Sequence, residues 1–435
     1  MSQSSQRTDS DSRIGIVLLN LGGPTSEPAV RLFLENLFGD RDIINLGGGA
    51  FQSRLAKVIA KLRYKGVAEK YREINACPNG CQGSKYCPNR QNKVISDCCS
   101  PINSLTEMQR RLLEKKLAAS FPGRYIKVYT AMRYWVPFDY DVFEEAVADE
   151  IDHLVLLPLY PHFSFTTTGS SFRNWEDIRN SRPEGSRQPS WQEYSIGHYH
   201  LNEQYITAIN KRIDERLMED FSDEERSKVH LVFTAHGTPL SEVAKGDPYT
   251  RHIEETVDAV MKLRGYHETH WLGYQSRVGP SKWTQPNTEE LVLRLIRYGI
   301  KHMVLIPVAF VTDHIETLHE LNIELREVIE EEKLHVEKMV VSKGLNGHPD
   351  FLAALEEEIL KKIGHITGEP AEESAEKPAE ESAGEPAEAA VEVQKGPSDR
   401  EAGDTGQGAS IQPVKNGGSD SPVRAPEHDR SELSG

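Results

Sequence analysis

Short apolar runs alternate with amphipathic segments along most of the 435-residue chain. The apolar runs predict buried strands at Ile14–Leu19, Ile126–Thr130, His153–Leu159, His230–Thr234, Thr269–Tyr274, His302–Phe310 and Val336–Val341. Between them, apolar residues recur at helical spacing in Ala29–Leu37, Phe51–Tyr71, Leu105–Ala119, Leu201–Met218, Thr250–Leu263, Thr288–Tyr298, Ile315–Glu331 and Phe351–Ile363. Strands that alternate with helices indicate βαβ units, so we predict an α/β protein with mostly parallel sheets flanked by helices.

Two pairs of strand segments resemble each other in the same order along the chain. The first pair is Val128–Arg133 and Val232–Gly237, and the second is His153–Leu159 and His302–Val308. Two ordered matches favour a duplicated α/β unit over chance similarity. On this interpretation Arg133 and His236 lie at equivalent strand ends, and a ligand cleft lies between the halves.

The composition of the C-terminal end differs from that of the rest. Residues 367–435 carry 16 acidic and 6 basic side chains, and so hold −10 of the net charge of −16. They contain too few large apolar residues to form a core, so a disordered acidic tail is predicted. No basic stripe indicates nucleic-acid binding. No apolar run is long enough to span a membrane, and the N-terminus lacks a signal-peptide core. We expect a cytoplasmic protein and leave a peripheral membrane contact open.

Ionisable residues follow two of the predicted strands, at the sheet edge where α/β proteins bind ligands. His236 follows one, while Asp313, His314 and Glu316 follow the other. A neutral imidazole facing carboxylates suits proton removal and metal handling. The local alternative is a capping box, in which Asp313 caps the helix and Glu316 reaches back. Capping does not explain Glu320. Asp313, Glu316 and Glu320 share one face of an α-helix, and this row of carboxylates predicts a route for protons or hydrated cations.

Seven ordered motifs resemble those of the ferrochelatase family, whose members insert ferrous iron into a porphyrin. They are Ile16–Pro24, Thr130–Tyr134, Tyr160–Ser170, Thr234–Pro239, Gly246–Tyr249, Tyr274–Pro280 and Thr312–Leu318. The resemblance spans about Ile14 to Ile363 and implies two similar Rossmann-like domains with the porphyrin in the cleft between them.

The resemblance also implies roles for individual residues. It places His236 and Glu316 in the active site, as catalytic residues and ligands of the substrate Fe²⁺, with Asp313, His314 and Glu320 supporting a proton or metal path. Porphyrin-binding residues would be Arg133, Tyr134, Leu21 and Trp283. Whether His236 first accepts a proton or first binds the metal is left open. The porphyrin and ferrous iron are the expected partners.

The expected domain organisation follows from the tail, the strand pattern and the resemblance. Residues 1–13 form a disordered N-terminus, 14–172 a first α/β domain with a cysteine-rich insert at 75–99, and 173–343 a second α/β domain. Residues 344–366 form a C-terminal helix packed on the first domain, and 367–435 the acidic tail.

The insert holds all five cysteines of the chain: Cys77, Cys81, Cys87, Cys98 and Cys99. An odd number in a chain expected to be cytosolic argues against disulfides, and clustering argues for a metal site. Structural zinc is one interpretation. Since some ferrochelatases carry a [2Fe–2S] cluster, we favour a cluster on Cys77, Cys81, Cys87 and either Cys98 or Cys99. In relatives with a C-terminal cluster one ligand follows a Tyr-Pro motif, where this chain has Phe165.

Other functions remain open at this point. A cobalt or nickel chelatase would share the fold and the histidine, and a non-catalytic haem or metal carrier would use His236 as an axial ligand. Leu21 favours protoporphyrin IX over coproporphyrin, because coproporphyrin-using relatives tend to have tyrosine there. The oligomeric state cannot be predicted.

Overall fold

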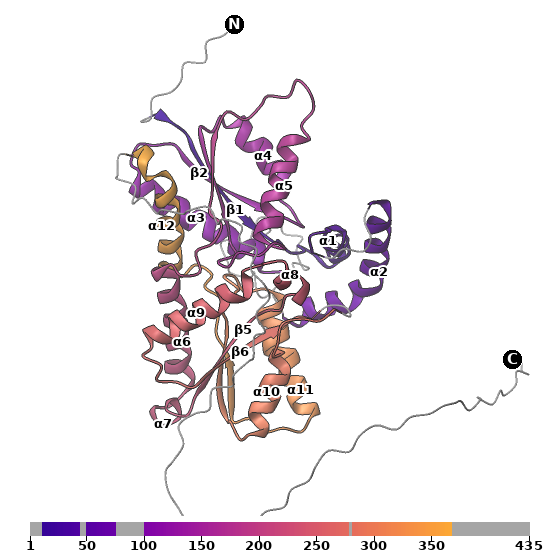
Figure 1. Cartoon of the computed structure of the whole chain (residues 1–435), viewed down its shortest axis with the longest axis vertical. Helices are drawn as coiled ribbons and strands as arrows, with labels where there is room; N and C mark the ends of the chain where they lie inside the picture. The colour runs from indigo at the N-terminus through magenta and orange to yellow at the C-terminus, as the bar shows by residue number, and fades with distance from the viewer. Residues whose placement is uncertain (1–10, 44–48, 75–99, 278–280, 368–435) are drawn as a thin grey trace, which may run out of the picture. The chain divides into compact units, whose positions relative to one another are not determined.

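The computed structural model describes residues 11–43, 49–74, 100–277 and 281–367, and it contains two four-stranded parallel sheets (Figure 1). The first sheet has the order β2-β1-β3-β4 and the second the order β6-β5-β7-β8. The strands of the first sheet are β1 (Ile14–Asn20), β2 (Ile126–Met132), β3 (His153–Pro158) and β4 (Gln192–Ser195). Those of the second are β5 (His230–His236), β6 (His270–Gln275), β7 (His302–Pro307) and β8 (Lys338–Val341).

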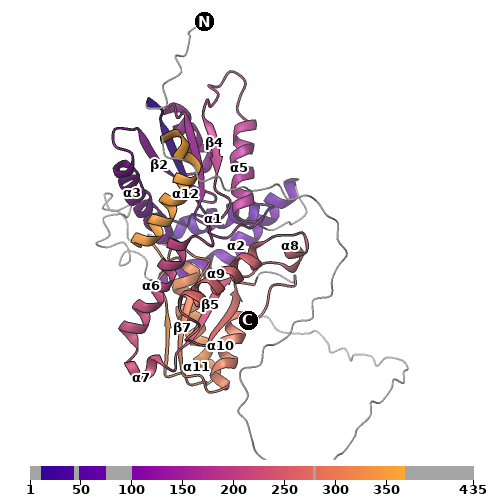
Figure 2. The same ribbon diagram turned by 60° about the vertical axis from the view of Figure 1, so that its left-hand side comes forward.

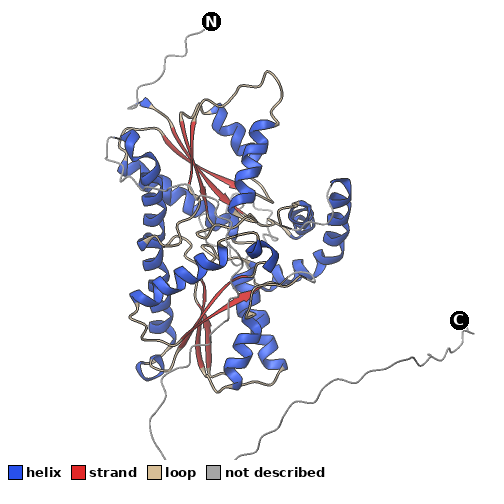
Figure 3. Cartoon of the chain, in the orientation of Figure 1, coloured by secondary structure: helices blue, strands red, loops and turns tan. Residues whose placement is uncertain are grey.

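The central strands are buried on both faces, as parallel strands between helical layers must be. Every residue of β1 is buried. Alternate side chains of β1 enter different cores: Ile16 and Leu18 join one cluster, and Val17 and Leu19 another. Figure 3 shows helices covering both faces of each sheet.

The helices that cover the first sheet pack into these two clusters. Helices α4 (Asp139–Ala148) and α5 (Thr168–Asn180) cover the Val17 face with Phe143 and Trp175. Helix α3 (Ile102–Ser120) covers the other face, and α12 (Pro349–Thr367) packs against α3 (Figure 2).

The second sheet is covered in the same way. Helix α10 (Thr288–Arg297), the π-helix η3 (Glu316–Glu324) and α11 (Leu325–Glu331) pack on one face. Helices α6 (Glu203–Asp220) and α9 (Tyr249–Leu263) pack on the other. Two short helices, α7 (Asp223–Arg226) and α8 (Leu240–Ala244), complete this half.

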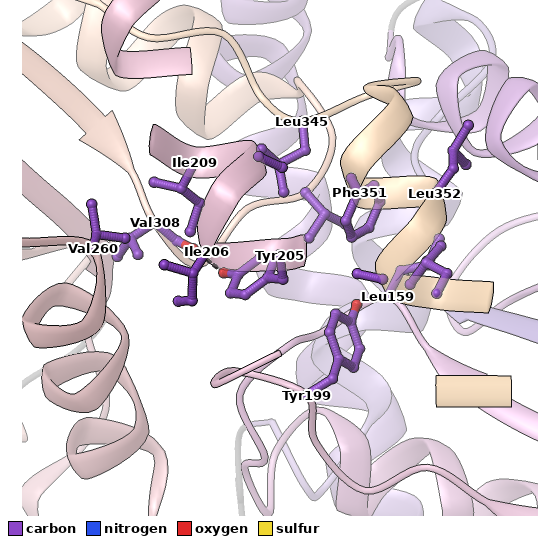
Figure 4. Packing of buried hydrophobic residues seen from close by; sticks show 14 of the residues in the cluster. Leu159, Tyr199, Tyr205, Ile206, Ile209, Val260, Val308, Leu345, Phe351 and Leu352 are labelled. Carbon is purple, nitrogen blue, oxygen red and sulfur yellow. Dashed lines mark hydrogen bonds between the residues drawn. The ribbon is translucent and has the colours of Figure 1, made fainter. Parts of the chain in front are cut away.

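One hydrophobic cluster joins the two sheets. It contains β1 residues, β5 residues and the apolar faces of α6 and α12. Figure 4 shows Phe351 of α12 near Tyr205 of α6, whose hydroxyl donates a hydrogen bond of 2.7 Å to the carbonyl of Val308. Because this core is continuous, the two sheets are held as parts of one folded unit.

Helices α1 (Glu27–Gly39) and α2 (Gly49–Glu73) form a separate layer around their own cluster, which includes Phe33, Phe38 and Tyr134. Lys70 of α2 forms an ion pair of 2.7 Å with Glu324 of η3, so this layer contacts the second half of the chain. None of the helices in the described ranges combines the length and apolar character needed to cross a bilayer.

The predicted α/β class with parallel sheets is confirmed, and each predicted strand corresponds to an observed one. β4 was not predicted, because its sequence QEYS is polar. Since β4 pairs with β3, the first sheet continues beyond residue 172, where the first domain was expected to end. Helices α4 and α5 were also not predicted. The expected N-terminal disorder falls mostly outside the described residues, and the insert and the tail beyond Thr367 fall entirely outside them.

The predicted strand equivalence needs one correction. The matching sheet orders make β1 equivalent to β5, β2 to β6 and β3 to β7. The pairing of His153–Leu159 with His302–Val308 is therefore confirmed, while the pairing of Val128–Arg133 with Val232–Gly237 is wrong. Those two segments resemble each other because both are buried strands. Arg133, at the end of β2, is equivalent in position to Ser276 at the end of β6, not to His236.

Candidate active site

His236 ends β5, one of the two central strands of the second sheet. Its Nδ1 lies 2.9 Å from Oε2 of Glu316, and its side chain is 39% exposed. The next residue, Gly237, donates a backbone hydrogen bond of 2.8 Å to the carbonyl of Gln275. A Cβ at Gly237 would lie 3.0 Å from that oxygen, so glycine permits the close approach that fixes the end of β5.

Glu316 is the first residue of η3 and lies between two histidines. Its Oε1 is 3.7 Å from Nε2 of His314, whose Nδ1 lies 3.0 Å from the carbonyl oxygen of Thr312. Burial works against ionisation of Glu316, but the charges and hydrogen bonds of His236 and His314 outweigh it and hold the carboxyl pKa far below its usual value. Burial likewise opposes protonation of His236, but Glu316 prevails and raises the imidazole pKa.

Ser276 connects Glu316 to a second carboxylate. Its hydroxyl lies 3.2 Å from Oε2 of Glu316 and 2.5 Å from Oε2 of Glu320. Its φ of +64° places a non-glycine residue in the left-handed region, which costs backbone energy. Burial and the negative charge of Glu316 raise the pKa of Glu320. Glu316 is therefore the ionised member of the pair, and Glu320 holds a proton more readily.

The predicted row of three carboxylates is arranged differently. Oδ1 of Asp313 accepts a hydrogen bond of 2.9 Å from the Gly344 backbone, and Oδ2 accepts one of 2.7 Å from the Asn346 side chain. Asp313 thus holds the 344–346 loop at the start of η3, while Glu316 and Glu320 converge on Ser276. The helix has no side-chain cap, so the capping box is not formed.

Arg133 and Tyr134 converge on Asp40. Oδ2 of Asp40 accepts hydrogen bonds from Nη2 of Arg133 at 2.9 Å, from the Tyr134 hydroxyl at 2.6 Å and from Ser170 Oγ at 3.1 Å. Asp40 was not predicted as a site residue, because no motif marks it and it lies 93 residues from Arg133 in the sequence. Burial, with Asp40 beside it, raises the pKa of the Tyr134 hydroxyl well above its usual value.

Two further predicted residues lie near these groups. The Trp283 ring centroid lies 6.2 Å from that of His236, with the planes at 71°. Leu21 packs against the α1–α2 cluster, and its carbonyl accepts a hydrogen bond of 3.1 Å from the Tyr134 backbone. The five cysteines lie outside the described residues.

Comparisons with known proteins identify relatives along most of the chain. The ferrochelatase family model matches residues 13–363. A ferrochelatase of Picosynechococcus sp. is 39% identical over 349 residues, covering 79% of this chain and 81% of that protein. One of Gloeobacter violaceus is 38% identical over 355 residues, covering 81% and 98%. The solved structure of SirB from Bacillus subtilis with Fe³⁺ aligns with 82% of this chain and 98% of that chain, at 13% identity and a TM-score of 0.43.

The matched region contains both sheets and every described residue of the site above. The identity to curated relatives extends over most of the length of both chains. The chain therefore belongs to the ferrochelatase family of lyases, the enzymes that insert iron into a porphyrin in haem synthesis.

Proposed function

We propose that the chain inserts Fe²⁺ into protoporphyrin IX, with His236 and Glu316 as the catalytic pair. The observation that carries this proposal is the contact of 2.9 Å between His236 Nδ1 and Glu316 Oε2 at the carboxyl end of a central strand. A partly exposed imidazole beside a buried, ionised carboxylate supplies both a proton acceptor and a ligand for a divalent cation.

The reaction releases two pyrrole protons for each iron inserted. His236 accepts the first, because Glu316 stabilises the imidazolium that forms. Glu320, whose pKa is raised, carries a proton onward, and the Ser276 hydroxyl bridges it to Glu316. Glu316, which stays ionised, replaces water on the incoming iron. Protons and metal thus use neighbouring carboxylates, which the Ser276 hydroxyl bridges.

The porphyrin is proposed to lie against Arg133, Tyr134, Leu21 and Trp283. A porphyrin propionate and Asp40 would compete for Arg133, so Asp40 prevents that cation from being buried unpaired in the free enzyme. Leu21 supports protoporphyrin IX, because an apolar side chain suits the vinyl groups better than the additional propionates of coproporphyrin.

The test measures iron insertion and porphyrin binding separately. We expect His236→Ala and Glu316→Ala to abolish insertion while porphyrin binding, followed by fluorescence, changes little. His335→Ala, an exposed histidine away from the site, is the control. Near-normal turnover by either site variant contradicts the proposal. Turnover with coproporphyrin equal to that with protoporphyrin IX contradicts the substrate assignment.

For the cysteine insert we propose a [2Fe–2S] cluster on Cys77, Cys81, Cys87 and one of Cys98 and Cys99. Its support is clustering within 23 residues. The visible spectrum of the purified chain before substrate is added tests this, and Cys81→Ser should remove the cluster bands. A colourless, zinc-containing protein would instead support structural zinc.

We further propose a peripheral membrane contact through α2. Phe51, Val58 and Leu62 share one helical face, and Leu62 is 78% exposed. Exposed basic residues flank this face: Arg54, Lys57, Lys61 and Lys65. An apolar stripe with flanking cations suits an anionic lipid surface. Val58→Glu/Leu62→Glu should reduce co-sedimentation with anionic vesicles, whereas Met218→Glu, at a residue 67% exposed on α6, should not.

A further inference from the structure

Four histidines gather away from the His236 site, around the N-terminal part of α9. His162 lies in the loop after β3, His198 and His200 lie between β4 and α6, and His252 lies on α9. The rings of His200 and His252 stack at 3.8 Å with their planes at 10°. The His198 centroid lies 5.0 and 4.9 Å from those of His200 and His252. The iron-insertion proposal uses none of these residues.

A carboxylate completes the group. Nε2 of His200 lies 2.7 Å from Oε2 of Glu255, which is one helical turn from His252 on α9. One potential ligand atom from each of His200, His252 and Glu255 lies within 4.8 Å of the other two. Imidazole nitrogens with a carboxylate oxygen form a donor set suited to divalent transition metals.

Hydrogen bonding leaves ring nitrogens of this cluster unsatisfied. Glu255 partners only Nε2 of His200, and Nδ1 of the same ring is buried without a partner in the described structure. His162 is alike: Nε2 lies 2.9 Å from the Thr256 hydroxyl, while its buried Nδ1 has no described partner. Buried polar atoms rarely lack a partner, so the orphan Nδ1 of His200 points to a ligand.

We propose that His200, His252 and Glu255 form a second cation site, which binds a divalent transition-metal ion such as Zn²⁺. Ligand distances to zinc are about 2.0–2.2 Å, so the group must contract around the ion. The two stacked rings turn apart about their side-chain torsions to share it. His198 is exposed beside them, and gives the ion access from solvent and a further imidazole ligand.

A long hydrogen bond at His252 supports binding in this place. His252 Nδ1 accepts a long hydrogen bond, 3.3 Å, from the Phe163 backbone N–H. A bond of this length is weak enough to be replaced by a metal ion. The ion would link α9 of the second half to the 198–200 segment that follows β4 of the first sheet. Bound ion therefore stabilises the folded chain.

The test is calorimetric titration of the full chain with Zn²⁺ alone, without porphyrin. We expect His252→Gln to lose one zinc equivalent, or to weaken it at least tenfold. Glu255→Gln, at a partly exposed position, should act in the same way and keeps the proposal testable if His252→Gln does not fold. His335→Gln should leave every equivalent unchanged, and His236→Ala should affect a different one.

A second readout uses thermal unfolding. Saturating Zn²⁺ should raise the unfolding temperature of the His236→Ala chain by several degrees more than that of the His236→Ala/Glu255→Gln chain. Equal zinc stoichiometry and affinity in the wild type, His252→Gln and Glu255→Gln overturns the proposal. Because binding is the readout, this result is independent of whether His236 and Glu316 catalyse iron insertion.

Discussion

Asp40→Ala tests whether the Asp40 carboxylate stabilises the fold by forming an ion pair with Arg133. Only 18% of the Arg133 side chain and 8% of the Asp40 side chain are exposed. Asp40→Ala leaves a largely buried guanidinium unpaired, a change that costs about 3–5 kcal/mol of unfolding free energy. The Tyr134 hydroxyl loses its acceptor in the same variant.

A matched control separates burial from geometry. Arg297 and Glu332 form an ion pair with the same distance of 2.9 Å, but both side chains are 51% exposed. Glu332→Ala should therefore cost less than about 1 kcal/mol. Urea unfolding followed by tryptophan fluorescence measures both, and the Asp40→Ala midpoint should shift several times further.

A double variant completes the experiment. Asp40→Ala/Arg133→Met removes both charges and leaves no unpaired cation, so it should be more stable than Asp40→Ala alone. If Asp40→Ala shifts the midpoint no more than Glu332→Ala does, the reasoning is refuted. The same holds if the double variant is the less stable of the two.

Three further predictions concern pH and packing. Burial raises the pKa of the Asp139 carboxyl from 3.8 to about 6, so the folded chain holds this proton more tightly than the unfolded chain does. The free energy of unfolding should therefore fall as pH rises between those values. Asp139→Asn should remove about 3 kcal/mol of this dependence, and parallel pH–stability curves of the wild type and the variant would contradict the prediction. Tyr205→Phe leaves the Val308 carbonyl without its hydrogen bond and should lower the free energy of unfolding in urea by about 1–3 kcal/mol. The control Tyr266→Phe, at an exposed position, should lower it less. Phe351→Ala should cost about 3–5 kcal/mol because the side chain is fully buried, and a loss below about 1 kcal/mol would mean that α12 does not stabilise the shared core.

Local sequence predicted most of the secondary structure because burial imposes a pattern on a strand or helix. The continuous apolar run of β1, which is buried on both faces, and the helical spacing in α9 and α10 are examples. β4 escaped prediction because its four polar residues form a strand only through backbone pairing with β3. The segment Ile315–Glu331 was predicted as one α-helix, but it begins as a π-helix, whose wider turn the residue types do not specify.

The sequence by itself determined the α/β class, the strand end that carries His236, and the family. These depend on burial periodicity and on motifs that are contiguous along the chain. Tertiary structure decided which polar side chains pair with one another in the site. It assigned Ser276 to the two glutamates, Asp313 to the 344–346 loop and Asp40 to Arg133, through contacts between residues 31 to 93 positions apart. The physical reason is that a buried charge or hydrogen-bonding group is satisfied by whichever group packing places beside it, and sequence distance does not record that neighbour.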